Sequence, residues 1–336
     1  MSLEIRFLSG RDVESLDLTP EEVMTAVEGA LRAQGEGRVV LEPREHLVPD
    51  PSFHGHFNIL RAYLGPVGLA GVKVVGDYVQ NWKLGLPSEL ALLTLYEPRT
   101  GAPLAILDAT AITEWRTGAT TAIGGRYLAR SGARVLGHVG ARGTAFSNVT
   151  MLDSLLDFEE IRVTSRRPES REDFGRRLER ALGKDVSVVA SVREAVEGAD
   201  VVVEATRLQV PEPILRTEWI EPGALVIPYG TISAVELSLT EVMDKIVVDD
   251  WAQCRRGPFG ALRPHVDSGR LSEETLHGEL GEIVAGRKPG REAEDERILL
   301  WHRGLATADV AVGALLYERA VAQGAGTALP YRGIGP

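Results

Sequence analysis

Residues 135–145 carry the clearest chemical signature in the chain. Their sequence, VLGHVGARGTA, predicts a strand, a glycine turn and a helix that begins near Thr144. Such a turn bends tightly and lets backbone N–H groups approach a pyrophosphate at the helix N-terminus. Gly140 takes the first glycine position, and Ala145 takes the third. Arg142 stands at the second, where it should either crowd the pyrophosphate or pair with it.

The next strand, at 161–164, indicates which nucleotide the turn would serve. It is followed by Ser165, Arg166 and Arg167, and no carboxylate occurs before Glu169. NAD sites usually place Asp or Glu here to bind the ribose 2′-hydroxyl, whereas NADP sites use a nearby arginine. The sequence therefore favours NADP(H) over NAD(H). The alternative is a solvated arginine pair.

Three cations in the first third of the chain are candidates for binding a carboxylate. Lys73 interrupts an apolar strand (GVKVV), where a lysine is rarely buried without a partner or a task. Arg116 lies on a helix of small residues, and Arg44 lies in a predicted loop. Together they would clamp a carboxylate, and desolvation would lower the pKa of Lys73 toward acid–base work. The alternatives are an edge-strand lysine that reaches water and ordinary salt bridges or solvated arginines.

The histidines do not predict a metal site. His54 and His56 are spaced to share one face of a strand, with His46 nearby, but no adjacent cysteine or carboxylate completes a ligand set. No nucleophile–histidine–acid arrangement stands out either. We expect no metal.

Composition limits the class of protein. The chain has 336 residues, of which 44% are hydrophobic and 25% charged, as in ordinary globular proteins. A net charge of −11 argues against nucleic acid as the main partner. No apolar run is long enough to span a membrane, and the start of the chain shows no signal-peptide pattern. The single cysteine, Cys254, suits a reducing compartment. We expect a cytoplasmic protein.

The coarse pattern predicts two kinds of structure. Before residue 126 it indicates a capped helix from Pro20, short strands joined by a hairpin turn at 97–101, and a helix from about 110. From 133 onward, apolar strands alternate with helices, which indicates an α/β fold with a Rossmann-type, doubly wound parallel sheet. A final helix at 306–322 is apolar on most faces, and 255–268 has no clear assignment.

Taken together, these segments resemble the ornithine cyclodeaminase/mu-crystallin family over nearly the whole chain. The order and spacing of the matching stretches are the specific signal; they lie at 71–73, 86–88, 96–101, 115–119, 278–291 and 304–311, besides the turn at Gly140.

The resemblance implies a Rossmann domain at 126–304 inserted into an α+β substrate-binding and dimerisation domain made from 1–125 and 305–336. It implies NAD(P) chemistry on a small imino or amino acid in a homodimer. By motif position, Arg44, Lys73 and Arg116 would hold the substrate carboxylate, with Lys73 and Arg116 as the catalytic residues. The implied cofactor-binding set is Ser88, Arg116, Thr117, Gly140, Arg142, Gly143, Thr144, Ala145, Ser165, Arg166, Arg167, Thr206 and Asp309.

One departure from the family bears on the reaction. Ornithine cyclodeaminases bind the distal amine of the substrate with an aspartate that aligns with Gly230, and no carboxylate follows here until Glu236. This weakens ornithine cyclisation but not imine reduction, so an imine reductase or amino-acid dehydrogenase is the leading hypothesis. A cyclodeaminase that releases ammonia with bound cofactor, a non-catalytic NADPH-gated binder of a small carboxylate and a protein with a dead nucleotide site remain as alternatives.

Overall fold

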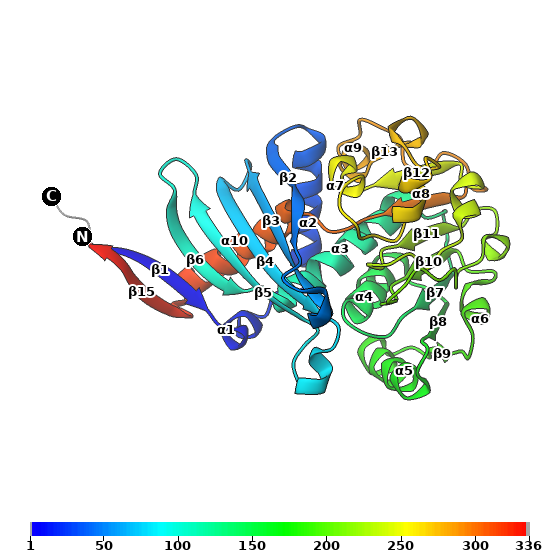
Figure 1. The fold of residues 1–336 in the computed structure, drawn as a ribbon, viewed down its shortest axis with the longest axis horizontal. Helices are drawn as coiled ribbons and strands as arrows, with labels where there is room; N and C mark the ends of the chain where they lie inside the picture. Colours follow the sequence, from blue (N-terminus) through cyan, green and yellow to red (C-terminus); the bar gives the residue numbers. More distant parts are fainter. Residues whose placement is uncertain (1, 334–336) are drawn as a thin grey trace. The chain divides into compact units, whose positions relative to one another are not determined.

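The computed structural model describes residues 2–333, except for the side chains of Ser2 and Trp82. The chain forms two compact units (Figure 1). The first unit joins Met1–Arg116 to Leu305–Pro336, and the second is Thr117–Gly304. The predicted boundary at 304/305 coincides with this division. The other boundary lies between Arg116 and Thr117, whereas the predicted one lies at 125/126; both positions fall within helix α3 (Thr110–Leu128).

The first unit is built on a seven-stranded sheet in which all neighbours are antiparallel except β1 and β6. In spatial order its strands are β15 (Thr327–Gly333), β1 (Ser2–Leu8), β6 (Ala102–Asp108), β5 (Glu89–Glu97), β4 (Leu69–Tyr78), β3 (Gly55–Leu64) and β2 (Val39–Leu47). The strands β1 and β15 extend as a two-stranded ribbon (Figure 1).

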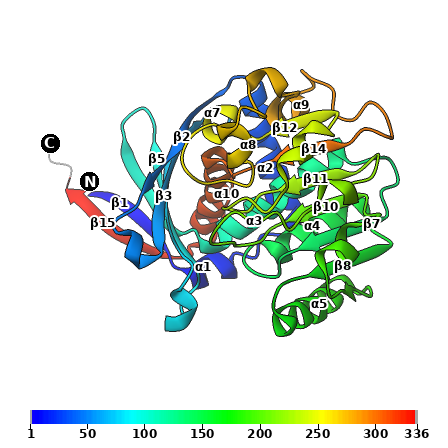
Figure 2. The same cartoon turned by 45° about the vertical axis from the view of Figure 1, so that its right-hand side comes forward.

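Two long helices cover one face of this sheet and lie against each other, as Figure 2 shows. They are α2 (Pro20–Gly35), which follows the short α1 (Gly10–Ser15), and α10 (Ala306–Gln323). The predicted start of α2 is confirmed, because Thr19 caps it in a reciprocal capping box with Glu22. Helix α10 packs closely on the sheet: a Cβ on Gly71 would lie 2.5 Å from a methyl group of Val310.

The second unit is a parallel sheet with the doubly wound strand order that the sequence predicts. From edge to edge it contains β13 (Gly278–Glu279), β12 (Lys245–Val248), β14 (Ile298–Trp301), β11 (Leu225–Pro228), β10 (Val201–Glu204), β7 (Val135–Val139), β8 (Glu160–Thr164) and β9 (Ser187–Val188). Because β8 and β10 flank β7 on opposite sides, the order of the strands reverses between β7 and β10.

The helices of the second unit beyond α3 are α4 (Ala145–Leu156), α5 (Pro168–Leu182), α6 (Val192–Val196), α7 (Trp251–Cys254), α8 (Arg263–Asp267) and α9 (Leu280–Val284). The segment at 255–268 that the sequence leaves unassigned thus contains α8. The central strands are buried on both faces, and Trp301 is the largest fully buried side chain. No helix among the described residues is long and apolar enough to cross a membrane.

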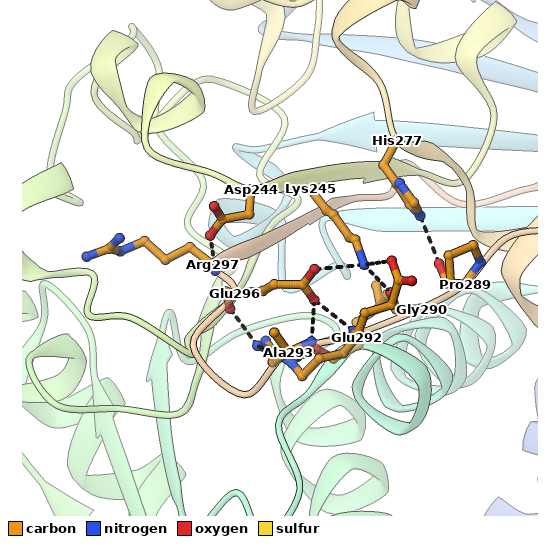
Figure 3. A network of polar contacts seen from close by, with 11 residues as sticks. Asp244, Lys245, His277, Pro289, Gly290, Glu292, Ala293, Glu296 and Arg297 are labelled. Carbon is orange, nitrogen blue, oxygen red and sulfur yellow. Dashed lines mark hydrogen bonds and ion pairs between the residues drawn. The ribbon is translucent and has the colours of Figure 1, made fainter.

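The motif at 278–291 has a structural role in this unit. Figure 3 shows the segment after α9 held by the buried side chain of Lys245, whose Nζ donates to the Gly290 carbonyl (2.7 Å) and to the Glu292 carboxylate (2.7 Å). Arg291 in turn donates to the Leu128 carbonyl at the end of α3 (2.9 Å). The motif therefore fixes a loop to the end of α3, where helix carbonyls need partners.

Candidate functional site

Lys73 lies on β4 with its side chain directed at the covering helices of the first unit. Its Nζ donates to Asp309 Oδ1 on α10 (2.5 Å) and to Thr113 Oγ1 on α3 (3.1 Å). Arg116, one turn further along α3, donates from Nε to the same Asp309 oxygen (3.0 Å). Lys73 and Asp309 are fully buried, and Arg116 is nearly so. The predicted lysine and arginine therefore meet at one carboxylate.

The charges around Lys73 are unbalanced toward the positive. Burial lowers the pKa of Lys73 to about 7; Asp309 raises it, and the positive charges of Arg116 and Arg44 lower it. The positive charges of Lys73, Arg116 and Arg44 thus act on one another, and one aspartate, Asp309, opposes them. Asp309 Oδ2 makes no hydrogen bond to the described residues. A buried excess of positive charge with this geometry favours an anionic ligand.

The same face of the sheet continues the polar surface beyond Lys73. Asn58 on β3 pairs in register with His46 on β2, and His56 pairs in register with Asp77 on β4. The rings of His46 and His56 lie 5.5 Å apart, edge to face. The sequence indicated only the histidines here. Because successive side chains of a strand point to opposite faces of the sheet, Asn58 on β3 and Asp77 on β4 lie on the same face as these histidines. No group of three or more metal-binding side chains occurs in residues 2–333.

In the second unit, the glycine turn connects β7 to α4. Gly140 has a φ of +114°, and a Cβ there would lie 2.6 Å from the Ala205 carbonyl oxygen, so only glycine fits. Gly143 carries the other positive φ of the turn (+58°). Arg142 has an ordinary backbone conformation and an exposed side chain. The missing second glycine therefore does not block the turn.

The end of β8 has the composition that the sequence suggested. The Thr164 hydroxyl donates to the Val189 carbonyl (2.9 Å), and the Ser165 hydroxyl donates to the Arg167 carbonyl (3.3 Å). Arg166 and Arg167 are exposed at the start of α5. No acidic side chain separates this strand end from α5, so it offers cations and hydroxyl groups to a ligand.

A buried polar network joins the glycine turn to the neighbouring elements. The hydroxyl of Thr144, the N-cap of α4, bonds to the hydroxyl of Tyr229, which also accepts from Asn148 (2.5 Å). Thr121 of α3 bonds to Asn148 (3.1 Å) and to the His302 ring (3.0 Å), and that ring stacks on Tyr229. The sequence predicted Thr144 but not the other members of the network; Asn148 lies on the same helix, and Thr121, Tyr229 and His302 come from three distant segments.

These features fit a dinucleotide. Three features at one sheet edge are those with which doubly wound sheets bind phosphate groups: a glycine that tolerates no Cβ, a long helix whose N-cap side chain does not cap it, and a reversal of strand order. Thr206, after β10, lies at that edge, and Thr117 is buried at the start of the second unit. Ser88 and Asp309 lie in the first unit, where Asp309 contacts Lys73; their cofactor contacts stay predictions.

The comparisons with known proteins agree with this geometry. The model of the "Ornithine cyclodeaminase/mu-crystallin family" matches residues 4–324. The alanine dehydrogenase of Archaeoglobus fulgidus is 33% identical over 98% of this chain and 99% of its own.

Two solved structures are also similar over almost their whole length. The Thermococcus litoralis Delta(1)-pyrroline-2-carboxylate reductase in complex with NADH and L-proline has a TM-score of 0.89 and 31% identity, covering 96% of this chain and 99% of its own. An archaeal alanine dehydrogenase dimer with bound NAD has a TM-score of 0.89 and 32% identity, covering 98% and 100%. The chain therefore belongs to the ornithine cyclodeaminase/mu-crystallin family.

Proposed function

We propose that this NAD(P)-dependent oxidoreductase of imino and amino acids reduces the C=N bond of a small 2-imino acid with NADPH, and catalyses the reverse oxidation. The observation that carries the proposal is the buried Lys73, held between Asp309 and Thr113 beside Arg116. The related reductase bound to NADH and L-proline supports this substrate class.

The three cations bind the substrate carboxylate. Arg116 donates from Nε to Asp309, which fixes the plane of its guanidinium, and a guanidinium held in this way suits recognition of a carboxylate. Arg44 adds a second positive charge from β2. The orientation of the carboxylate sets the position of the adjacent imine carbon, so the clamp also supplies the positioning part of catalysis.

Lys73 moves the proton. A bound reduced nicotinamide supplies a hydride to the imine carbon, and the imine nitrogen then needs one proton. Lys73 has a pKa of about 7 and therefore holds or releases a proton near neutral pH, which suits a general acid in reduction and a general base in oxidation. Asp309 stabilises the protonated form of Lys73, which burial alone would disfavour.

The cofactor preference we propose is NADP(H). The end of β8 offers Ser165, Arg166 and Arg167 and no acidic residue that would repel a 2′-phosphate. The related structures contain NAD or NADH, so the proposal of NADP(H) rests on the residues of this chain alone.

We further propose a homodimer formed through the uncovered face of the first unit's sheet. This face presents exposed apolar residues from adjacent strands; they are Leu47, Val74, Leu90 and Leu92. Val74 and Leu92 pair in register. An apolar patch of this kind marks an interface, and the archaeal alanine dehydrogenase is a dimer. Light scattering should give a dimer that Leu92→Glu converts to a monomer; a monomeric wild type contradicts the proposal.

The substitution Lys73→Met tests the catalytic assignment, because it keeps the length of the side chain and removes the proton. Loss of a general acid should lower kcat for imine reduction about 10²–10⁴-fold, while the Kd for NADPH stays the same. Lys288→Met changes a surface lysine and should leave both constants unchanged. An unchanged kcat in Lys73→Met overturns the assignment.

A further inference from the structure

Glu204 is a buried acid that the proposed mechanism does not use. It is the last residue of β10, fully inaccessible to solvent, and pairs in register with Val139 at the end of β7 and with Pro228 at the end of β11. It therefore lies at the carboxyl edge of the sheet, beside the reversal of strand order. Ligands of doubly wound sheets bind outside this edge at such a reversal.

The two oxygens of Glu204 have different surroundings. Oε1 accepts from the Thr206 backbone N–H (2.7 Å) and from the Thr206 hydroxyl (2.5 Å). Oε2 makes no hydrogen bond of ordinary geometry to any described residue, although its atom is completely buried. Leaving a buried polar atom unsatisfied costs about 1–3 kcal/mol, so native structures rarely do so without a functional reason.

The backbone of Gly230 packs closely against this carboxyl group. A Cβ on Gly230, beyond the end of β11, would lie 3.2 Å from Glu204 Oε2 and 2.9 Å from the Thr206 carbonyl oxygen. On the other side, Ala205 leaves no room for a Cβ on Gly140 of the nucleotide turn. The segment from Glu204 to Thr206 thus lies between the glycine turn and Gly230, and Glu204 supplies the only acid within that segment.

We propose that Glu204 is a specificity-determining residue of the cofactor site, where its buried carboxyl group lies behind the nicotinamide end of the dinucleotide and distinguishes the oxidised from the reduced form by charge. This inference rests on the proposed cofactor site. An oxidised nicotinamide ring carries a positive charge that the reduced ring lacks. An ionised Glu204 therefore favours the oxidised cofactor, whereas the neutral acid does not discriminate by charge.

Glu204 changes charge near neutral pH. Burial raises its pKa to about 7, while the N–H and hydroxyl of Thr206 and the N–H of Gly230 lower it. Ionisation as the pH rises through about 7 should therefore strengthen the binding of oxidised relative to reduced cofactor.

The neighbouring titratable groups behave differently. Burial raises the pKa of Tyr229 to about 12 and lowers that of His138, on the adjacent β7, to about 4, so neither titrates near pH 7. Arg207 acts on Tyr229 as a fixed positive charge. His302 stacks on Tyr229 and is a further histidine close to this site. A comparison of two proteins that differ only at Glu204 separates its effect from that of His302.

The experiment measures the Kd of NADP⁺ and of NADPH by calorimetry between about pH 6 and pH 8, in the wild type and in Glu204→Gln. The glutamine keeps an acceptor for Thr206 but cannot ionise. In the wild type, the ratio of the NADPH Kd to the NADP⁺ Kd should rise about tenfold across this range. In Glu204→Gln it should stay constant. The 2′-phosphate titrates in both cofactors and cancels in the ratio.

Two further variants sharpen the result. Thr206→Val removes one donor to Oε1 and should move the midpoint of the pH dependence upward, which tests the idea even if Glu204→Gln does not fold. Glu212→Gln alters an exposed acid of the same unit and should match the wild type. A ratio that is constant in the wild type, or that varies equally in Glu204→Gln, overturns the inference alone. Absence of binding of either cofactor to the wild type overturns the proposed function as well.

Discussion

Lys73 and Asp309 are 236 residues apart in sequence and form an ion pair in which neither side chain is accessible to solvent. The aspartate is the group that opposes the effect of burial on the lysine. Asp309→Asn should therefore lower the Lys73 pKa below about 7, so that most Lys73 side chains are neutral at pH 7. We expect kcat for imine reduction at pH 7 to fall about 10²-fold and the pH profile to move toward acid.

Thr113→Val is the matched control for this change. It removes the longer of the two hydrogen bonds to Lys73 but leaves the carboxylate in place. Its pH profile should stay within a few tenths of a unit of the wild type, by the modest size of one neutral hydrogen bond. Initial rates over a pH series give both results, and an Asp309→Asn profile that superimposes on the wild type contradicts the assigned role of the aspartate.

The two directions of the reaction should depend on pH in opposite ways. Reduction needs protonated Lys73, so its kcat/KM should be constant below about pH 7 and decrease above it. Oxidation of the amino acid needs neutral Lys73, so its kcat/KM should rise through the same pH and then level off. The residual activity of Lys73→Met should lack both limbs; if it retains them, another group carries the proton.

Arg166 should control the choice of cofactor. Arg166→Ala removes one positive charge from the end of β8, where no acid is present to bind a ribose hydroxyl instead. We expect the Kd for NADPH to increase about tenfold, since a charge-assisted contact contributes about 1.5–3 kcal/mol, with little change for NADH. Fluorescence titration measures both constants. Equal effects on NADPH and NADH would show that the arginine does not contact the 2′-phosphate.

Glu204 should also link stability to pH. Its pKa is about 7 in the folded protein and has the ordinary value of 4.5 in the unfolded chain. Between these two pH values the folded protein therefore retains a proton that the unfolded chain has lost. The free energy of unfolding should therefore decrease as the pH rises through this window. Glu204→Gln lacks this decrease, so the Tm of the variant minus the Tm of the wild type should increase from pH 5 to pH 8. A constant difference in Tm argues that Glu204 is ionised throughout.

Lys245 should stabilise the second unit without affecting the reaction. It is buried and donates to the Gly290 carbonyl, and Glu292 and Glu296 hold its pKa above the ordinary value in spite of burial (Figure 3). Lys245→Met should lower the free energy of unfolding by roughly 2 kcal/mol, the range of a hydrogen bond to a charged group. Urea denaturation measures this loss, and the Kd for NADPH should stay unchanged.

Much of the fold could be predicted from local patterns. The capping box at Thr19, the buried parallel strands and the turn at Gly140 are short-range signals with direct physical causes. The reading of Arg142 was harder. The sequence shows that a glycine is missing, but only the backbone angles show that Gly143 takes the second positive φ instead.

The cations of the site could be predicted from the sequence, whereas Asp309 was predicted only as a cofactor contact and not as the partner of Lys73. Lys73 attracted attention because it interrupts an apolar strand, and Arg116 because it stands among small residues. Asp309 comes from the other end of the chain, and its pairing with Lys73 depends on the close packing of α10 on β4. Glu204 had a comparable signal, an acid at the end of the apolar run VVVE, but its significance depends on its place beside the reversal of strand order and on the missing hydrogen-bond partner of Oε2.

The discontinuity of the first unit has a consequence for synthesis on the ribosome. The second unit is one uninterrupted stretch, Thr117–Gly304, and all of its strands emerge before α10 is made. It can therefore fold during translation, as contiguous domains generally do. Lys73 must wait for Asp309, which emerges 236 residues later, so until then its ammonium group stays in water. The pairing of Lys73 with Asp309 is thus a late event in the folding of this chain.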